Sequence, residues 1–204
     1  SAPGTYRLVV QIPSSDFEKD YYLHIVDKDY GVRNLTLPKE KVELDTESLK
    51  RVEKESAEIN ALWKADITLP KWNSGFIMPV DGDIIGAFGK RSVINNLERS
   101  PHTGVDIKAG KGDPVKSTNN GKVVLVADHF FTGNSVFLDH GGGIISMYFH
   151  LDKILVKAGD IVEKGRIIGL AGATGRATGP HLHWGVRING ARVNPLTLVA
   201  ISKG

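Results

Sequence analysis

The sequence contains no cysteine among its 204 residues, and this absence narrows the possible chemistry. Disulfides, a cysteine nucleophile and a thiolate metal site are all excluded, so reactive groups must come from His, carboxylate, Ser or Lys side chains. No apolar run reaches the roughly 18 residues that a membrane-spanning helix needs, so we expect no transmembrane segment. With 41% hydrophobic residues the chain can still bury a core, which excludes wholesale disorder.

An excess of charge of one sign is also lacking, because 26 basic and 23 acidic residues leave a net charge of only +3. Such a mild excess permits an anionic partner without requiring one. The basic residues after residue 150 are scattered and are not interleaved with aromatic side chains. We therefore expect no nucleic-acid partner.

Composition changes sharply near residue 73. Residues 1–73 carry 11 basic and 13 acidic residues and two of the 23 glycines, whereas residues 74–204 carry 15 basic and 10 acidic residues and the other 21 glycines. The second part thus has a net charge of +5. We predict a small β-rich region over residues 1–45, an amphipathic helix and linker over 46–73, and a functional domain over 74–204.

The N-terminal part combines short strands with one helix. Residues 6–12 and 21–26 are rich in aromatic and β-branched side chains, and a turn leads into a further strand at 32–37. Apolar residues then recur at spacings of three and four, which predicts an amphipathic helix over 47–64. Asp45 or Thr46 is the expected N-cap.

The C-terminal part is predicted to be almost entirely β. Strand-like segments at 121–126, 135–139, 144–150 and 181–188 are separated by glycine-rich turns, with no helical period between them. This spacing indicates an all-β sandwich or barrel-like domain, so the fold class of the whole chain is mainly β with one helix.

His181 and His183 are the first candidates for chemistry. In a strand, residues i and i+2 point to the same face about 6–7 Å apart, whereas on a helix they would diverge. The two imidazoles therefore aim at one place while Leu182 and Trp184 pack the other way. They could share one zinc ion, or one could bind metal while the other moves protons.

Two further segments add ligand-type side chains. His102 and Asp106 would stand about 13 Å apart on a straight strand, too far to share one ion, so a common site requires a bend, which Thr103-Gly104 could provide. The segment around Tyr148 and His150 reads as a strand end carrying one histidine.

Together these motifs resemble the lysostaphin/LytM-type zinc metallopeptidases, which are bacterial cell-wall endopeptidases. The resemblance covers about residues 75–200. Besides the histidine motifs, it includes Phe88-Gly89-Lys90-Arg91, Gly104-Val105-Asp106-Ile107, Gly112-x-Pro114-Val115, Gly121-x-Val123, Gly159-Asp160-x-Val162-x-x-Gly165 and Gly172-x-Thr174-Gly175. Residues 1–73 are similar to the appended region of Gram-negative members.

The resemblance implies a role for each candidate residue. His102, Asp106 and His183 would hold one Zn²⁺, and His150 and His181 would act beside it as general base and acid. Three protein ligands with an open fourth position are typical of a catalytic zinc site. Tyr148 is a candidate to line the substrate groove, as are the aromatic rings at 130–131.

The resemblance also implies a substrate and a location. The expected reaction is hydrolysis of peptide bonds in peptidoglycan, in the bacterial cell envelope, either periplasmic or secreted. A different hypothesis is a non-catalytic regulator of cell-wall amidases, because some relatives have this domain without its metal ligands. A further hypothesis is that residues 1–73 inhibit the site by covering the groove.

Overall fold

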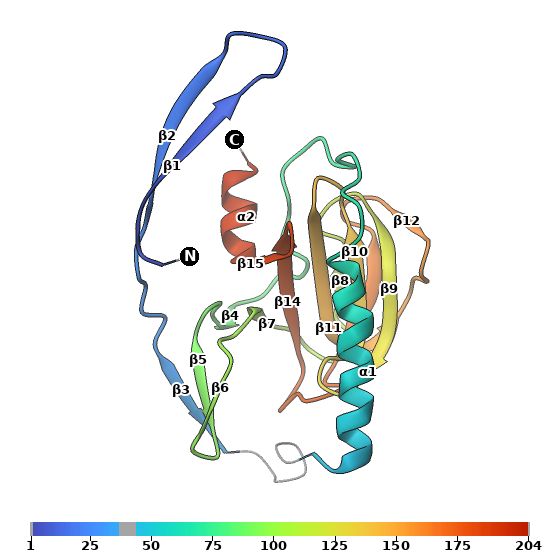
Figure 1. Cartoon of the computed structure of the whole chain (residues 1–204). Coiled ribbons are helices and arrows are strands. Elements are labelled where there is room, and N and C mark those ends of the chain that lie inside the picture. Colours follow the sequence, from blue (N-terminus) through green and yellow to red (C-terminus); the bar gives the residue numbers. More distant parts are fainter. Residues whose placement is uncertain (1, 37–43, 204) are drawn as a thin grey trace. The chain divides into compact units, whose positions relative to one another are not determined.

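Most of the regular secondary structure is antiparallel β-strand in the computed structural model, which describes residues 2–36 and 44–203 (Figure 1). The elements in chain order are β1 (Gly4–Gln11), β2 (Glu18–Ile25), β3 (Val32–Leu35), α1 (Thr46–Leu62), β4 (Ile84–Gly86), β5 (Arg91–Ile94), β6 (Leu97–Arg99), β7 (Gly104–Lys108), β8 (Pro114–Lys116), β9 (Gly121–His129), β10 (Gly133–Asp139), β11 (Ile144–Ile154), β12 (Ile161–Val162), β13 (Ile167–Ala171), β14 (His181–Ile188), β15 (Ala191–Val193) and α2 (Pro195–Ile201).

The first strands form a hairpin that is a unit of its own, because the chain separates into two compact units after Gly31. β1 and β2 pair antiparallel from Gly4 opposite Ile25 to Gln11 opposite Glu18. An ion pair at 2.8 Å between Arg7 and Asp20 joins the two strands. The two predicted N-terminal strands are thus confirmed, with bounds shifted by one to three residues.

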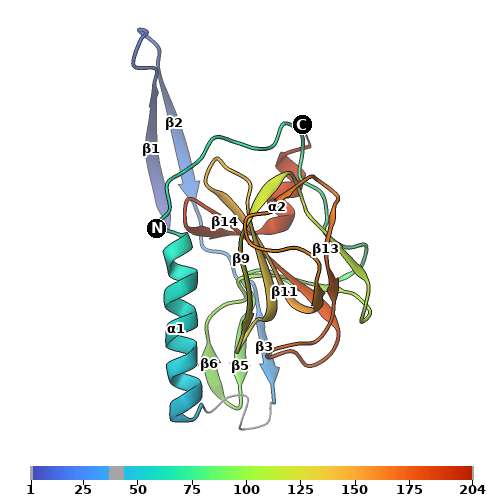
Figure 2. The ribbon, with the colours of Figure 1, turned by 90° about the vertical axis from the view of Figure 1, so that its right-hand side faces the viewer.

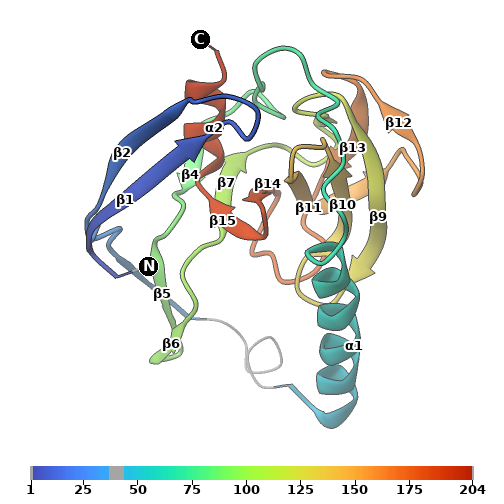
Figure 3. The same ribbon diagram turned by 45° about the horizontal axis from the view of Figure 1, so that its top comes forward.

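The second unit is built on one large sheet. Its strands follow the order β12-β9-β10-β11-β14-β7-β4, with β13 paired to β11 and β8, and with β15 paired to β14. Figure 3 shows β14, β11, β10 and β9 side by side in this sheet. A separate three-stranded sheet joins β3, β5 and β6, in which β3 runs parallel to β5. The predicted strand over 32–37 is confirmed at 32–35, and residue 37 lies outside the described residues.

Side-chain alternation gives the large sheet two different faces. On β14, Leu182 and Trp184 are fully buried in the main hydrophobic core, as the sequence predicts. The core draws on most strands of the second unit and on α2. The largest buried side chains in it are Trp184, Tyr148, Phe76, Ile107, Leu138, Leu151, Ile168 and Leu182.

The opposite face of the sheet carries α1. Phe137, Met147 and Phe149 form a second buried cluster on this face, against which Ile59, Leu62 and Trp63 of α1 and its C-cap pack. Figures 1 and 2, taken at right angles, place the helix on one side of the strands. The predicted helix is confirmed over Thr46–Leu62, and Asp45 is its N-cap, because its carboxylate accepts a hydrogen bond from the Ser48 amide at 2.7 Å.

A second helix, α2, is absent from the sequence predictions. The Asn194 side chain caps it and Pro195 occupies its first turn, two signals typical of a helix start. The apolar repeat was too short to reveal it, since α2 has only seven residues. Within the described residues neither helix combines the length and apolarity needed to cross a membrane.

The mainly β fold class is confirmed. Across the described residues the large sheet curves into a sandwich-like arrangement and does not close into a barrel. The division into residues 1–45, 46–73 and 74–204 stays a prediction.

His140 is completely buried at the turn after β10. Its Nδ1 lies 2.7 Å from the Asn120 carbonyl oxygen, and its Nε2 lies 2.7 Å from the Ser146 hydroxyl. Burial disfavours the charged ring and lowers the pKa of His140 to about 4. The neutral ring is therefore a structural part of the core.

We predict that this histidine makes the fold sensitive to acid. Because its folded-state pKa lies below its ordinary value of 6.5, the unfolded chain takes up the proton first as pH falls. The stabilisation is complete above pH 6.5 and is lost progressively towards pH 4, a loss of about 3 kcal/mol. Urea unfolding of the wild type and of His140→Gln at several pH values measures it.

The variant should be less stable at pH 7 yet lose less stability between pH 6.5 and 4 than the wild type does. His24→Gln, in the exposed part of β2, is the matched control and should follow the wild-type curve. Equal slopes for wild type and His140→Gln would contradict the assignment.

Candidate functional site

Strand pairing brings Asp106 and His183 together. β7 and β14 run antiparallel with these two residues directly opposite each other. Both point away from the core, to the face of the sheet that also carries α1. His183 Nδ1 lies 2.8 Å from Asp106 Oδ1. Both residues are buried, with 8% of the surface of each exposed.

His102 reaches the same point from outside the strand. β7 begins at Gly104, so His102 precedes the strand and Asp106 lies in it, with the change at the predicted position. Backbone hydrogen bonds from the Gly89 amide to the His102 carbonyl and from the His102 amide to the Lys90 carbonyl hold the segment. His102 Nε2 then lies 2.9 Å from Asp106 Oδ1 and 3.0 Å from His183 Nδ1.

Two glycines leave the space that these side chains occupy. A Cβ atom on Gly86 would lie 2.3 Å from Asp106 Oδ2, and one on Gly104 would lie 2.8 Å from His183 Nε2 and 2.3 Å from the Trp184 carbonyl oxygen. Real Cβ atoms essentially never approach another heavy atom to within 3.0 Å. The close packing of β4, β7 and β14 around the site therefore depends on glycine at both positions.

The surroundings shift the pKa values of Asp106 and His183. Burial alone would raise the pKa of Asp106, but the hydrogen bonds and charges of His102 and His183 outweigh burial and hold that pKa well below its usual range. The pKa of His183 is lowered, chiefly because the ring is buried. A carboxylate and two imidazoles thus meet in a place with little water.

The donor atoms fit a divalent metal ion. His102 Nδ1 lies 2.9 Å from the Ala87 carbonyl oxygen, which accepts its proton and leaves a lone pair on Nε2. That lone pair faces the Asp106 carboxylate oxygen, which is also a pure acceptor. A cation between them removes the repulsion, and two imidazole nitrogens with one carboxylate oxygen are a donor set typical of zinc. In the part of the chain that the structure describes, His102, Asp106 and His183 are the group that could hold an ion.

His150 and His181 lie beside this group. Their ring centroids are 4.9 Å apart, and His181 Nε2 is 3.8 Å from Asp106 Oδ1. His150 Nδ1 lies 2.9 Å from the Thr174 carbonyl oxygen, and His181 Nδ1 lies 2.8 Å from the Gly179 carbonyl oxygen. Each ring thus has its Nδ1 proton committed and its Nε2 available. Burial and the neighbouring His183 lower the pKa of His150 to about 4, so its ring is neutral at pH 7.

The expectation that Tyr148 lines a substrate groove is wrong. Its side chain is fully buried in the main core, and its hydroxyl lies 3.0 Å from the Thr118 amide and 2.9 Å from the Ser146 hydroxyl. Regular alternation would put Tyr148 and His150 on the same face. His150 instead has a φ of 63°, at an irregularity in the pairing of β10 with β11, and this break turns its ring to the other face.

Other groups of the site were not among the predicted site residues. The Ala87, Thr174 and Gly179 groups that orient the histidines are backbone carbonyls, which any residue could supply. Phe149 stacks on the His183 ring at 5.3 Å with an interplanar angle of 4°. Its pairing partner in β14 is His183, so strand register alone could have identified it.

We predict that Gly104→Ala weakens metal binding without altering any donor atom. The new methyl group would displace β14 or the His183 ring. Disturbing the surroundings that orient a metal ligand costs about ten- to hundredfold in metal affinity. Zinc retained after dialysis against graded chelator, measured by mass spectrometry of the metal, tests this. Gly179→Ala is the matched control, since its Cβ would meet open space. Equal zinc retention by both variants would contradict the prediction.

Comparison with known sequences places this site in a known family. The model of peptidase family M23 matches residues 100–195. The peptidoglycan DD-endopeptidase ShyB of Vibrio cholerae is 47% identical over 96 residues, which are 47% of this chain and 22% of that protein. The DD-carboxypeptidase/endopeptidase Mpg of Neisseria meningitidis is 40% identical over 97 residues, 48% of this chain and 22% of that protein. The matched segment spans about a fifth of the length of these curated relatives.

Solved structures give the same assignment over more of the chain. A zinc containing peptidase from Vibrio cholerae has a TM-score of 0.57 and 41% identity, covering 60% of this chain and 39% of that one. A peptidase M23 protein from Pseudomonas aeruginosa has a TM-score of 0.76 and 36% identity, covering 100% of this chain and 76% of that one. The chain therefore belongs to peptidase family M23.

Proposed function

We propose that the chain is a zinc-dependent endopeptidase that hydrolyses peptide bonds of bacterial peptidoglycan. The observation that carries the proposal is the convergence of His102 Nε2, Asp106 Oδ1 and His183 Nδ1 within 3.0 Å of one another. The curated relatives named as peptidoglycan endopeptidases support the substrate.

In this proposal His102, Asp106 and His183 hold the zinc ion. When bound, zinc supplies a Lewis acid that polarises the scissile carbonyl and makes water a better nucleophile at neutral pH. Asp106 contributes its full negative charge, because its pKa is held well below neutrality. The Ala87 carbonyl keeps the His102 ring in the tautomer that offers Nε2.

His150 and His181 would carry the proton. The neutral His150 ring can accept a proton at Nε2 from the attacking water, since its Nδ1 proton is already donated to the Thr174 carbonyl. The same site must deliver a proton to the leaving amine as the C–N bond breaks and the C–O bond forms. His181, with its ring centroid 4.9 Å from that of His150, is placed for the second transfer.

Location follows from the proposed substrate. A peptidoglycan hydrolase works in the bacterial cell envelope, in the periplasm or outside the cell. The net charge of +5 over residues 74–204 is compatible with an anionic cell wall. All five polar side chains of the site are present, which counts against a non-catalytic regulator of amidases.

We predict that the two roles separate on mutation. His102→Ala removes a metal donor, so it should abolish both zinc binding and cleavage. His150→Ala should keep zinc but lose cleavage by 10²- to 10⁴-fold, because it removes proton transfer alone. Mass spectrometry of soluble products from purified peptidoglycan measures cleavage and identifies the bond that is cut.

His24→Ala, outside the site, is the control and should act like the wild type. An inert wild-type protein with zinc bound would refute the enzymatic proposal. Unchanged activity of His102→Ala would instead support the regulator.

A further inference from the structure

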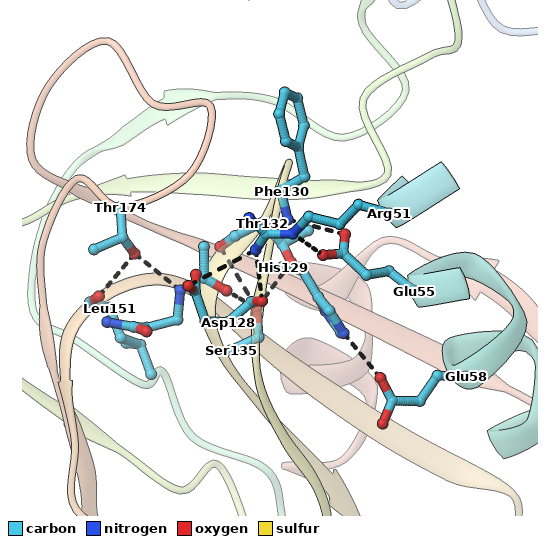
Figure 4. Close-up of polar contacts among 12 residues, drawn as sticks. Arg51, Glu55, Glu58, Asp128, His129, Phe130, Thr132, Ser135, Leu151 and Thr174 are labelled. Atoms are coloured by element: carbon cyan, nitrogen blue, oxygen red, sulfur yellow. Dashed lines mark hydrogen bonds and ion pairs between the residues drawn. The ribbon is translucent and has the colours of Figure 1, made fainter. Parts of the chain in front are cut away.

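Helix α1, on the same sheet face as the site, is hydrogen-bonded to the loop that joins β9 and β10. This loop, with the adjoining strand ends, is called here the 128–134 loop. Glu55 Oε2 accepts a hydrogen bond from the Phe130 amide at 2.9 Å, and Arg51 Nη2 donates to the Asp128 carbonyl at 2.9 Å. Arg51 and Glu55 are themselves paired, with Nε and Oε1 2.6 Å apart. Figure 4 shows both side chains reaching from the helix to the backbone of the loop.

The same loop is hydrogen-bonded to His150. The His150 amide donates to the Thr132 carbonyl at 2.9 Å. The Asn134 amide donates to Thr174 Oγ1 at 2.9 Å, and that hydroxyl donates to the Leu151 carbonyl at 2.8 Å. Thr174 also provides the carbonyl that faces His150 Nδ1. The loop thus holds the histidine at its backbone and, through Thr174, at its ring.

The fit between the loop and Thr174 is tight. A Cβ on Gly133 would lie 2.3 Å from Thr174 Oγ1, and one on Gly175 would lie 2.3 Å from the Gly133 amide nitrogen. The Arg176 amide also donates to the Phe131 carbonyl at 2.9 Å. A displacement of the loop must therefore displace the segment that carries Thr174.

His150 needs such support because of its backbone. Its φ of 63° lies in the left-handed region, which a residue other than glycine adopts only where its surroundings enforce it. The hydrogen bond from the His150 amide to the Thr132 carbonyl and the one from its ring to the Thr174 carbonyl enforce this conformation here. Without them, an ordinary strand conformation would turn the ring towards the core face.

We propose that Glu55 of α1 is a positioning residue for His150, acting through the 128–134 loop and Thr174. The proposal rests on the proposed function for its catalytic consequence but not for its structural content. Among the glutamates of α1, Glu55 is singled out because it binds a backbone amide and only 14% of its side chain is exposed. Glu58 instead contacts the His129 ring, at 3.3 Å, and is 53% exposed.

The experiment compares Glu55→Ala, Glu55→Gln and Glu53→Ala in the full zinc-loaded chain. Glutamine keeps an oxygen that can accept from the Phe130 amide, and Glu53 is an exposed glutamate of the same helix. We expect Glu55→Ala to lower kcat about tenfold with little change in KM or zinc content, because a misplaced base slows only the chemical step. Glu55→Gln should recover most of the rate, and Glu53→Ala should match the wild type.

A second readout does not depend on activity. Nitrogen-15 NMR of the His150 ring should report one tautomer, protonated at Nδ1, in the wild type, and a mixture of tautomers in Glu55→Ala. If the wild type proved inactive, the same change of tautomer in Glu55→Ala would still uphold the positioning role, while the inactivity would refute the endopeptidase. Unchanged tautomer and unchanged kcat in Glu55→Ala would overturn the inference.

Two other outcomes would also overturn it. A rise in kcat would mean that α1 restrains the site, and loss of zinc together with kcat would mean a general structural role. Thr174→Val tests the site end of the same path, since it removes the hydroxyl and keeps the shape, with Thr174→Ser as its matched control. Thr174→Val must reproduce the mixed tautomers, and a single tautomer there would refute the path.

Discussion

A hydrogen bond from a histidine Nδ1 to a backbone carbonyl recurs three times in the site, and the proposed chemistry depends on it. The carbonyls of Ala87, Thr174 and Gly179 hold the rings of His102, His150 and His181. Each bond fixes one tautomer and leaves Nε2 with its lone pair. Because backbone carbonyls accept these hydrogen bonds, the loops that carry the carbonyls must be held in place accurately by their packing. The orientations of these three histidine rings therefore depend on three irregular segments of the chain.

Accuracy of that kind comes from the large sheet. Its alternation assigns one face to the core and the other to the site and α1, so Trp184 and His183 serve opposite purposes although they are adjacent in sequence. Pairing of β14 with both β7 and β11 then sets Asp106 and Phe149 on either side of His183. Three neighbouring strands therefore provide a proposed metal donor, its carboxylate partner and the aromatic ring stacked on it.

The sequence predicted these relations wherever a regular repeat carried them. The His-x-His spacing placed His181 and His183 on one face, and glycine after Thr103 marked the break that brings His102 to Asp106. Regularity also caused the error at Tyr148, because a strand period assigns Tyr148 and His150 to one face. The left-handed backbone of His150 breaks that period, and its cause lies in contacts with Thr132 and Thr174 that are distant in sequence.

By itself the sequence determined the side chains available for chemistry and the mainly β class, because composition and short periods are local properties. The expected metal ligands came from the resemblance to a known family. The fold alone decided the distances of 2.8–3.0 Å among the three donors, the tautomers of the histidines and the connection from α1 to His150. Those properties arise where segments up to about eighty residues apart are pressed together, as His102 and His183 are. Packing between such distant segments depends on the whole chain at once, so no local pattern encodes it.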